Sequence, residues 1–176
     1  QALDSLSIAM SEIGAISERR IHFFMKGADN KIPMFGAVNG GLESGFMLAH
    51  VTAASLASEN KTLAHPSSVD SLSTSAGQED IVSMAPWAGR SCLRILDNVR
   101  MILAIELLVA GNINHRFHHK LSSSNGLQPL MKLLKKSKVL SKIDRVFSKD
   151  IEIISELIKT DQVYSVVNKV NKISRV

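Results

Sequence analysis

Apolar residues recur at intervals of three and four along most of the chain, which is the spacing of one face of an α-helix. This pattern predicts a first helix over residues 2–25 and a second over residues 42–61, separated by a loop that is rich in Gly and Pro. One stripe of the first helix contains Leu3, Leu6, Met10, Ile13, Ile16, Arg20 and Phe24. The inner surface of the second contains Ala49, Ala53, Ala54, Ser55, Ala57 and Ser58, small side chains that predict close helix packing.

A third long helix is predicted over residues 78–111, after a Ser-rich connection. Pro86 lies inside it, and an interior proline costs about 3 kcal/mol unless the helix bends, so we expect a bend near residues 84–87. Beyond the bend, apolar residues occupy more than one side, which indicates burial against several neighbours. Polar residues 112–125 predict a loop.

Three shorter helices complete the prediction, over residues 126–136, 149–159 and 161–172. Asn125 and Ser148 are suitable N-cap residues for the first two. The chain has no convincing alternating pattern of the kind that strands show. The predicted fold class is therefore all-α, a long-helix bundle in which a long-helix segment (1–111) and a basic short-helix segment (112–176) form one domain.

Composition indicates a soluble protein with a real core. The 176 residues are 45% hydrophobic, and the longest apolar stretch, residues 101–113, is too short for a membrane helix of about 20 residues. The single cysteine, Cys92, excludes an internal disulfide framework and fits a reducing cytoplasm. Because the chain begins at Gln1 directly within a helical pattern, we expect it to be a fragment of a longer protein.

The positive charge is confined to the C-terminal part. Residues 1–110 hold 8 Lys/Arg and 11 Asp/Glu, whereas residues 111–176 hold 13 and 5. Such asymmetry can mark a nucleic-acid partner, and a basic helical interaction domain without enzymatic activity is one interpretation. However, Lys132, Lys135 and Lys136 alternate with leucines, which favours a solvated helix face. We therefore do not expect a nucleic-acid partner.

Three histidines, His115, His118 and His119, are spaced by three and four residues, which could place two imidazoles on one helical face. The segment reads as a loop, and no carboxylate lies close in the sequence. We predict no metal site.

Gln78, Glu79 and Asp80 stand together in the stretch TSAGQEDIVSM, residues 74–84. Ser75 and Gln78 have the spacing of a helix capping box, and the two carboxylates would then lie in the first turn, where the helix dipole favours negative charge. Taken alone, this local interpretation is the simplest one.

A wider match changes that interpretation. Segments from the whole chain occur in the order SEIG and SERR (11–14 and 17–20), NGGLESGFM (39–47), VTAASLASENKTLAHPSSVDSLSTSAGQEDIVSM (51–84), LAIELL (103–108) and DRVFSKDIE (144–152). This series closely resembles the C-terminal third of histidine ammonia-lyase, a member of the aromatic amino-acid lyase family. The resemblance implies the C-terminal part of an ammonia-lyase-like helical fold that assembles as a homotetramer.

The resemblance also implies a chemistry, the elimination of ammonia from L-histidine to give urocanate. These enzymes use a methylidene-imidazolone group, formed by cyclisation of an internal Ala-Ser-Gly tripeptide, together with a tyrosine base. Here no Ala-Ser-Gly occurs, because Ser75-Ala76-Gly77 has the wrong order, and the single tyrosine, Tyr164, lies far beyond the matching motifs. We expect the prosthetic group in the full-length parent and not in this chain, which should be inactive alone.

One site position carries over from the resemblance. Glu79 corresponds to the acidic residue that faces the substrate in the histidine-specific enzymes, where relatives acting on phenylalanine or tyrosine tend to have Asn-Gln-Asp. A carboxylate suits the N–H groups of an imidazole and would be an unpaired buried charge against a phenyl ring. We assign Glu79 to substrate binding and a catalytic proton relay, and Gln78 to a supporting hydrogen bond. A related aromatic amino-acid ammonia-lyase or aminomutase remains the alternative.

The long helices carry apolar residues on more faces than a small bundle can cover. We therefore expect a contiguous exposed apolar patch and self-association. In a symmetric tetramer, Glu79 of one subunit could meet catalytic groups of others.

Overall fold

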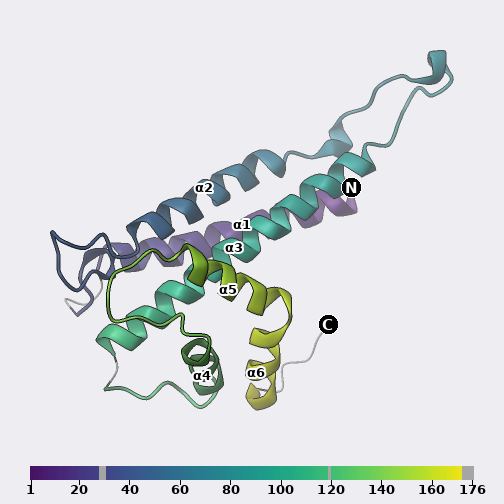
Figure 1. The fold of residues 1–176 in the computed structure, drawn as a ribbon. Helices are drawn as coiled ribbons and strands as arrows, with labels where there is room; N and C mark the ends of the chain where they lie inside the picture. Colours follow the sequence, from purple (N-terminus) through teal and green to yellow (C-terminus); the bar gives the residue numbers. More distant parts are fainter. Residues whose placement is uncertain (28–30, 119, 172–176) are drawn as a thin grey trace.

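The computed structural model describes residues 1–27, 31–118 and 120–171 (Figure 1). Within these residues the chain consists of helices and connecting loops and forms no β-strand of its own, which confirms the all-α prediction. The α-helices are α1 (Ala2–Met25), α2 (Met47–Leu63), α3 (Ala85–Phe117), α4 (Gln128–Lys136), α5 (Ser148–Lys159) and α6 (Gln162–Asn171). Short 3-10 turns are η1 (Met34–Gly36), η2 (Ser67–Val69) and η3 (Ser75–Gly77).

The three long helices lie side by side. Of the short helices, α5 packs on α3, and α6 contacts both α4 and α5 (Figure 1). α3 is the central element, because it contacts α1, α2 and α5. The connection between α2 and α3 leaves the bundle and projects from its end as a long hairpin (Figure 1). No helix in the described ranges combines the length and the apolar content needed to cross a bilayer.

The buried face of α1 is not its apolar stripe. Leu3, Leu6, Ile13 and Ile16 of that stripe are 39–54% exposed. The face that packs inside the bundle is instead small and polar over most of its length and ends in two apolar core residues. It consists of Asp4, Ser7, Ser11, Gly14, Ser17, Glu18, Ile21 and Met25. Small side chains let helix backbones approach closely, so α1 gains a tight contact with α3 and leaves most of its apolar stripe outside.

The close approach centres on Gly14. A Cβ atom at this position would lie 3.2 Å from a methyl group of Val99 and 3.3 Å from atoms of both Asn60 and Ile102. The remaining core comes mainly from α3, where Ile95, Ile102, Ile105 and Leu108 are fully buried, as predicted for its later turns. On α2, Ala49, Ala53 and Ala57 are buried as predicted, whereas Ser55 and Ser58 are exposed.

The start of α3 was predicted wrongly. The helix begins at Ala85, seven residues later than residue 78, and Pro86 lies in its first turn. Proline is well tolerated there, because the first-turn N–H groups have no partner within the helix. The bend expected near residues 84–87 is therefore a helix start, with Met84 as the N-cap residue.

The end of α3 also differs from the prediction. Residues 112–117, expected as a loop, continue the helix because two polar side chains find tertiary partners. The Asn112 amide donates to the carbonyls of Leu108 and Val139 at 2.9 and 3.1 Å. Arg116 donates to three loop carbonyls, those of Ser141, Gly36 and Ile143, at 2.8, 3.0 and 3.0 Å. Burial lowers the pKa of this guanidinium.

α2 begins at Met47 rather than at residue 42, because two carboxylates bind the preceding backbone. Glu43 accepts hydrogen bonds from the N–H groups of Val38 and Asn39, and Asp144 accepts those of Ser44 and Gly45 at 3.0 and 3.2 Å. The expected caps Asn125 and Ser148 are also wrong. Leu127 and Phe147 precede α4 and α5, and neither provides a side-chain cap.

The tight contact at Gly14 gives a first prediction. Gly14→Val should lower the free energy of unfolding by about 1 to 3 kcal/mol, because the added methyl groups overpack the contact with α3. Gly89→Val is the matched control, since a Cβ at Gly89 would meet only a Leu3 methyl at 3.8 Å. Urea unfolding followed by circular dichroism measures both, and equal effects at the two glycines would contradict close packing at Gly14.

Candidate functional site

The segment that carries Gln78 and Glu79 is the hairpin formed by residues 70–84, which joins η2 to α3 and extends beyond the helices (Figure 1). Thr74 and Glu79 pair in antiparallel fashion, with N···O distances of 3.0 and 3.2 Å for the two backbone hydrogen bonds. Three residues further from the tip on each side, the Ser71 hydroxyl accepts a hydrogen bond from the Val82 N–H at 2.8 Å. The hairpin therefore has two hydrogen-bonded pairs in one register.

The tip of the hairpin is η3, where the chain reverses. Ser75, Ala76 and Gly77 take φ values of 55°, 56° and 86°, in the left-handed region. This conformation is costly for Ser75 and Ala76, and such backbone strain is often found at functional segments. The predicted capping box does not form, because Ser75 belongs to this turn and the helix begins only at Ala85.

The base of the hairpin is tied to α1 by Asp4. Its carboxylate is 6% exposed and accepts hydrogen bonds from the N–H groups of Ser67 and Ser68, at 3.2 and 2.8 Å, and from the Ser68 hydroxyl. The hydroxyl bond is the main cause of a lowered pKa of Asp4, and the two backbone bonds act in the same direction. A charged residue of α1 thus holds the turn from which the hairpin leaves the bundle.

The Gln78 and Glu79 side chains are exposed in the single chain. Two clefts flank the base of the hairpin, with volumes of about 310 and 970 Å³, and neither is lined by Gln78 or Glu79. Because α3 begins only at Ala85, Gln78 and Glu79 do not lie at a helix N-terminus as expected. The hairpin that carries them extends beyond the ends of the helices (Figure 1).

A second group of charged residues lies between α1 and α2. Glu18 is buried and accepts hydrogen bonds from Arg19 at 2.5 and 2.6 Å and from the His50 ring at 2.9 Å. Burial by itself would raise the pKa of Glu18. The hydrogen bonds from Arg19 and His50 together have the larger effect, so the pKa is lowered. The group joins α1 to α2 and lies 14 residues from Asp4 along α1, roughly 20 Å from the hairpin base.

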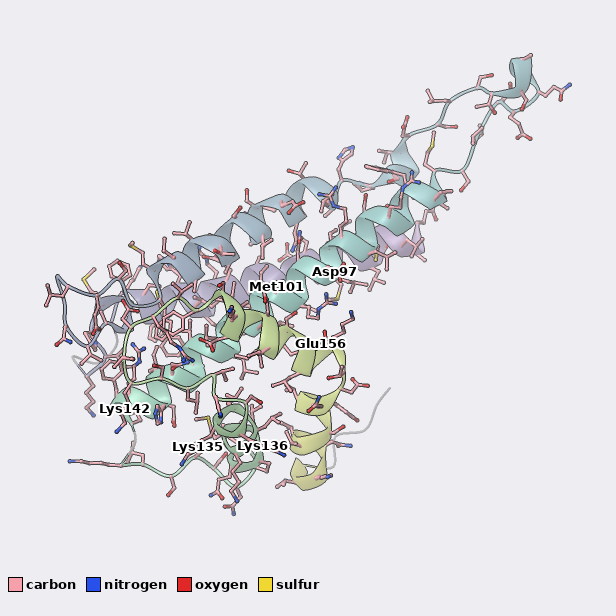
Figure 2. All side chains as sticks on the ribbon, viewed as in Figure 1. Asp97, Met101, Lys135, Lys136, Lys142 and Glu156 are labelled. Carbon is pink, nitrogen blue, oxygen red and sulfur yellow. The ribbon has the colours of Figure 1, made fainter. Side chains whose placement is uncertain are left out.

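The remaining candidates lie elsewhere. Within the described residues, no group of three or more His, Cys, Asp or Glu is arranged to hold a metal ion. His115 is in the last turn of α3 and His118 is its C-cap, so this segment is helical and not the expected loop, and His119 lies outside the described residues. The basic side chains Lys135, Lys136 and Lys142 lie on the α4 side of the molecule, far from the hairpin (Figure 2).

Known proteins place the chain in a family. The profile described as aromatic amino acid lyase matches residues 1–136. Histidine ammonia-lyase from Rhodospirillum rubrum is 51% identical over 157 residues, covering 89% of this chain and 30% of that protein. Histidine ammonia-lyase from Trypanosoma cruzi has a similar structure, with a TM-score of 0.90 at 40% identity over 96% of this chain and 33% of that one.

A further solved structure, tyrosine aminomutase from Streptomyces globisporus, has a TM-score of 0.88 at 26% identity, covering 98% of this chain and 33% of that one. These matches show that the chain belongs to the aromatic amino acid lyase family. Its similarity to histidine ammonia-lyases confirms the resemblance that the motifs indicated. The chain spans about 30% of the length of the curated relatives that it matches.

Sequence reasoning predicted Gln78 and Glu79 as site residues, and this stays a prediction. It did not single out Asp4 and Ser71, whose side chains bind the backbone of the hairpin and of the turn at its base. In the sequence, Asp4 is an acidic residue in the first turn of a helix, and the favourable interaction with the helix dipole is enough to explain its presence there. Its partner Ser68 is 64 residues away, so no local pattern connects them. Ser71 lies within the family-like segment, but its partner Val82 is 11 residues away. Only the hairpin in the structure brings the two together.

Asp4 predicts an acid-sensitive contact. Because the folded pKa is lowered, the carboxylate stabilises the fold above its ordinary pKa of about 3.9, and this stabilisation is lost as the pH falls through the folded pKa. When the pH is lowered from about 6 to about 2.5, the free energy of unfolding should therefore fall less in Asp4→Asn than in the unaltered chain. Urea unfolding at these pH values tests it. Glu152→Gln, at an exposed position of α5, is the control, and an unchanged pH profile in Asp4→Asn would contradict the prediction.

Proposed function

We propose that the chain is the C-terminal part of a histidine ammonia-lyase, which eliminates ammonia from L-histidine to give urocanate in histidine degradation. Its similarity to histidine ammonia-lyases over 89% and 96% of its length supports this substrate. The observation that carries the site assignment is the sequence Gln78-Glu79-Asp80 on a hydrogen-bonded hairpin at the end of the bundle. The single cysteine supports a cytoplasmic location.

Glu79 is proposed to bind the substrate imidazole. An imidazole donates an N–H to a carboxylate, and this charge-assisted hydrogen bond is stronger than one between neutral groups. Once a pocket encloses the pair, the same carboxylate can accept and return a proton on the ring. Gln78, the preceding residue on the hairpin, supports the arrangement by a hydrogen bond. A phenyl ring would leave the enclosed charge without a partner, which disfavours phenylalanine.

The pocket around Glu79 is proposed to form between subunits. The hairpin projects from the helices of its own chain (Figure 1). The apolar stripe of α1 is exposed as well, so both the hairpin and this stripe offer surface that another chain could cover. A homotetramer would bring Glu79 of one subunit to the catalytic groups of others.

Residues 1–176 do not fit the prosthetic group. The group forms from Ala-Ser-Gly, and the nearest sequence, Ser75-Ala76-Gly77, has a central residue without a hydroxyl group. Glu43-Ser44-Gly45 has a central serine, but the N–H groups of Ser44 and Gly45 are bound to the Asp144 carboxylate. We propose that another segment of the parent enzyme supplies the electrophile and that this chain is inactive alone.

A chimera tests the proposed function. The corresponding segment of the Rhodospirillum rubrum enzyme is replaced by the matching residues of this chain, and urocanate formation is followed by its ultraviolet absorbance. The chimera should be active on histidine, and the isolated chain should not. Glu79→Gln in the chimera should lower kcat/KM about 10- to 100-fold, because a hydrogen bond to a charged group is lost.

Glu152→Gln is the matched control for charge removal, because that carboxylate is exposed on α5. An active chimera that is indifferent to Glu79→Gln would refute the role of Glu79. Activity on tyrosine without activity on histidine would favour the alternative suggested by the tyrosine aminomutase fold.

The exposed stripe of α1 gives a separate prediction. The chain should self-associate, and replacing both Leu6 and Ile13 by Lys should shift it towards monomer, because the lysines add charge to an apolar contact. Replacing Ile143 and Val146, exposed residues between α4 and α5, by Lys is the control. Sedimentation velocity measures the three forms, and a cleanly monomeric unaltered chain would contradict the prediction.

A further inference from the structure

The hairpin lies outside the hydrophobic core, so little packing within its own chain fixes its shape. Residues 71–81 are all exposed. An isolated two-stranded hairpin is marginally stable in water. The orientation of Glu79 must therefore depend on the few hydrogen bonds that join the two sides of the hairpin and on the contact that holds its base.

We propose that Ser71 and Asp4 are positioning residues that hold Glu79 in the orientation needed for substrate binding. This inference rests on the proposed function. Ser71 fixes the register of the hairpin, and Asp4 fixes its base against α1. Neither residue needs to touch the substrate, because each acts through the backbone that carries Glu79.

Ser71 extends the register that the Thr74–Glu79 pair sets. Its hydroxyl accepts a hydrogen bond from the Val82 N–H at 2.8 Å and donates one to the Val82 carbonyl at 3.3 Å, so one side chain binds both backbone groups of its partner. Side chains alternate between the two faces of a paired strand, so a slip of one residue would turn the Glu79 carboxylate to the opposite face. The Ser71–Val82 pair opposes that slip.

Asp4 prevents a different movement. Its carboxylate accepts hydrogen bonds from the N–H groups of Ser67 and Ser68 in η2, four and three residues before Ser71. The other side of the hairpin runs directly into α3, which packs on α1. Both ends of the hairpin are thereby fixed to the same helix pair, and tilting of the whole hairpin would break the bonds of Asp4.

The test compares three variants of the active chimera. Ser71→Ala should raise the KM for histidine about three- to tenfold, the value of a single lost hydrogen bond, with a smaller change in kcat. Ser71→Thr keeps the hydroxyl and should restore the KM. Ser73→Ala, an exposed serine of the same hairpin for which the described structure shows no side-chain hydrogen bond, should have no effect.

A double-mutant cycle separates positioning from general loosening. If Ser71 acts through Glu79, Ser71→Ala should change KM by less than about twofold once Glu79→Gln is present. Independent, multiplicative effects would overturn the proposal while leaving the role of Glu79 intact. An active chimera in which Glu79→Gln itself has no effect would instead refute the role of Glu79, and a chimera without activity on histidine would contradict the proposed function.

Amide hydrogen exchange in the 176-residue chain provides a readout that needs no activity. Ser71→Ala should accelerate exchange at the Glu79 N–H, which is bonded to the Thr74 carbonyl, and Ser71→Thr should not. Asp4→Asn should accelerate exchange at Ser68 and at Glu79. If the Glu79 amide exchanges at an unchanged rate in both Ser71→Ala and Asp4→Asn, the hairpin is fixed by other contacts and the positioning role is wrong.

Discussion

The packing of the small, polar face of α1 into the bundle is the constraint on which the rest of this structure depends. At its centre, Gly14 brings the backbone of α1 so close to α3 that a side chain at this position would press on Val99. Near the start of α1 and again one turn after Gly14, the same face buries carboxylates that tie other elements to α1. Asp4 binds the turn below the hairpin, and Glu18 binds His50 of α2. One helix face therefore sets both the spacing of the long helices and the base of the candidate site.

This choice of face has a direct consequence for function. Because the small residues are buried, most of the apolar stripe of α1 remains on the surface, together with a hairpin on which Gln78 and Glu79 are exposed. A surface of this kind suits assembly with further chains better than it suits an independent monomer. The polar groups of the proposed site are thus held by one chain and are proposed to be enclosed by others.

The C-terminal half of α3 shows a second use of buried polar groups. Arg116 lies over the Phe46 ring, 4.8 Å from its centre, and binds three carbonyls from two separate loops. Leaving a buried carbonyl without a partner costs about 1 to 3 kcal/mol, and the bonds of Arg116 to Ser141 and Gly36 are buried. Polar residues that look like a loop in the sequence therefore extend the longest helix and connect the long-helix bundle to the segments around α4 and α5.

Local patterns in the sequence were sufficient to predict the all-α class, the extent of α1, the burial of α3 on several sides and, through the motifs, the family. These features depend on the 3.6-residue period and on short motifs, which adjacent residues determine. Only the tertiary structure decided which face of α1 is buried, that Pro86 begins a helix and that Ser75 and Gln78 belong to a hairpin. Each of these outcomes depends on partners far away in the sequence, such as Val99 for Gly14 and Ser68 for Asp4, whose contacts outweigh local preference.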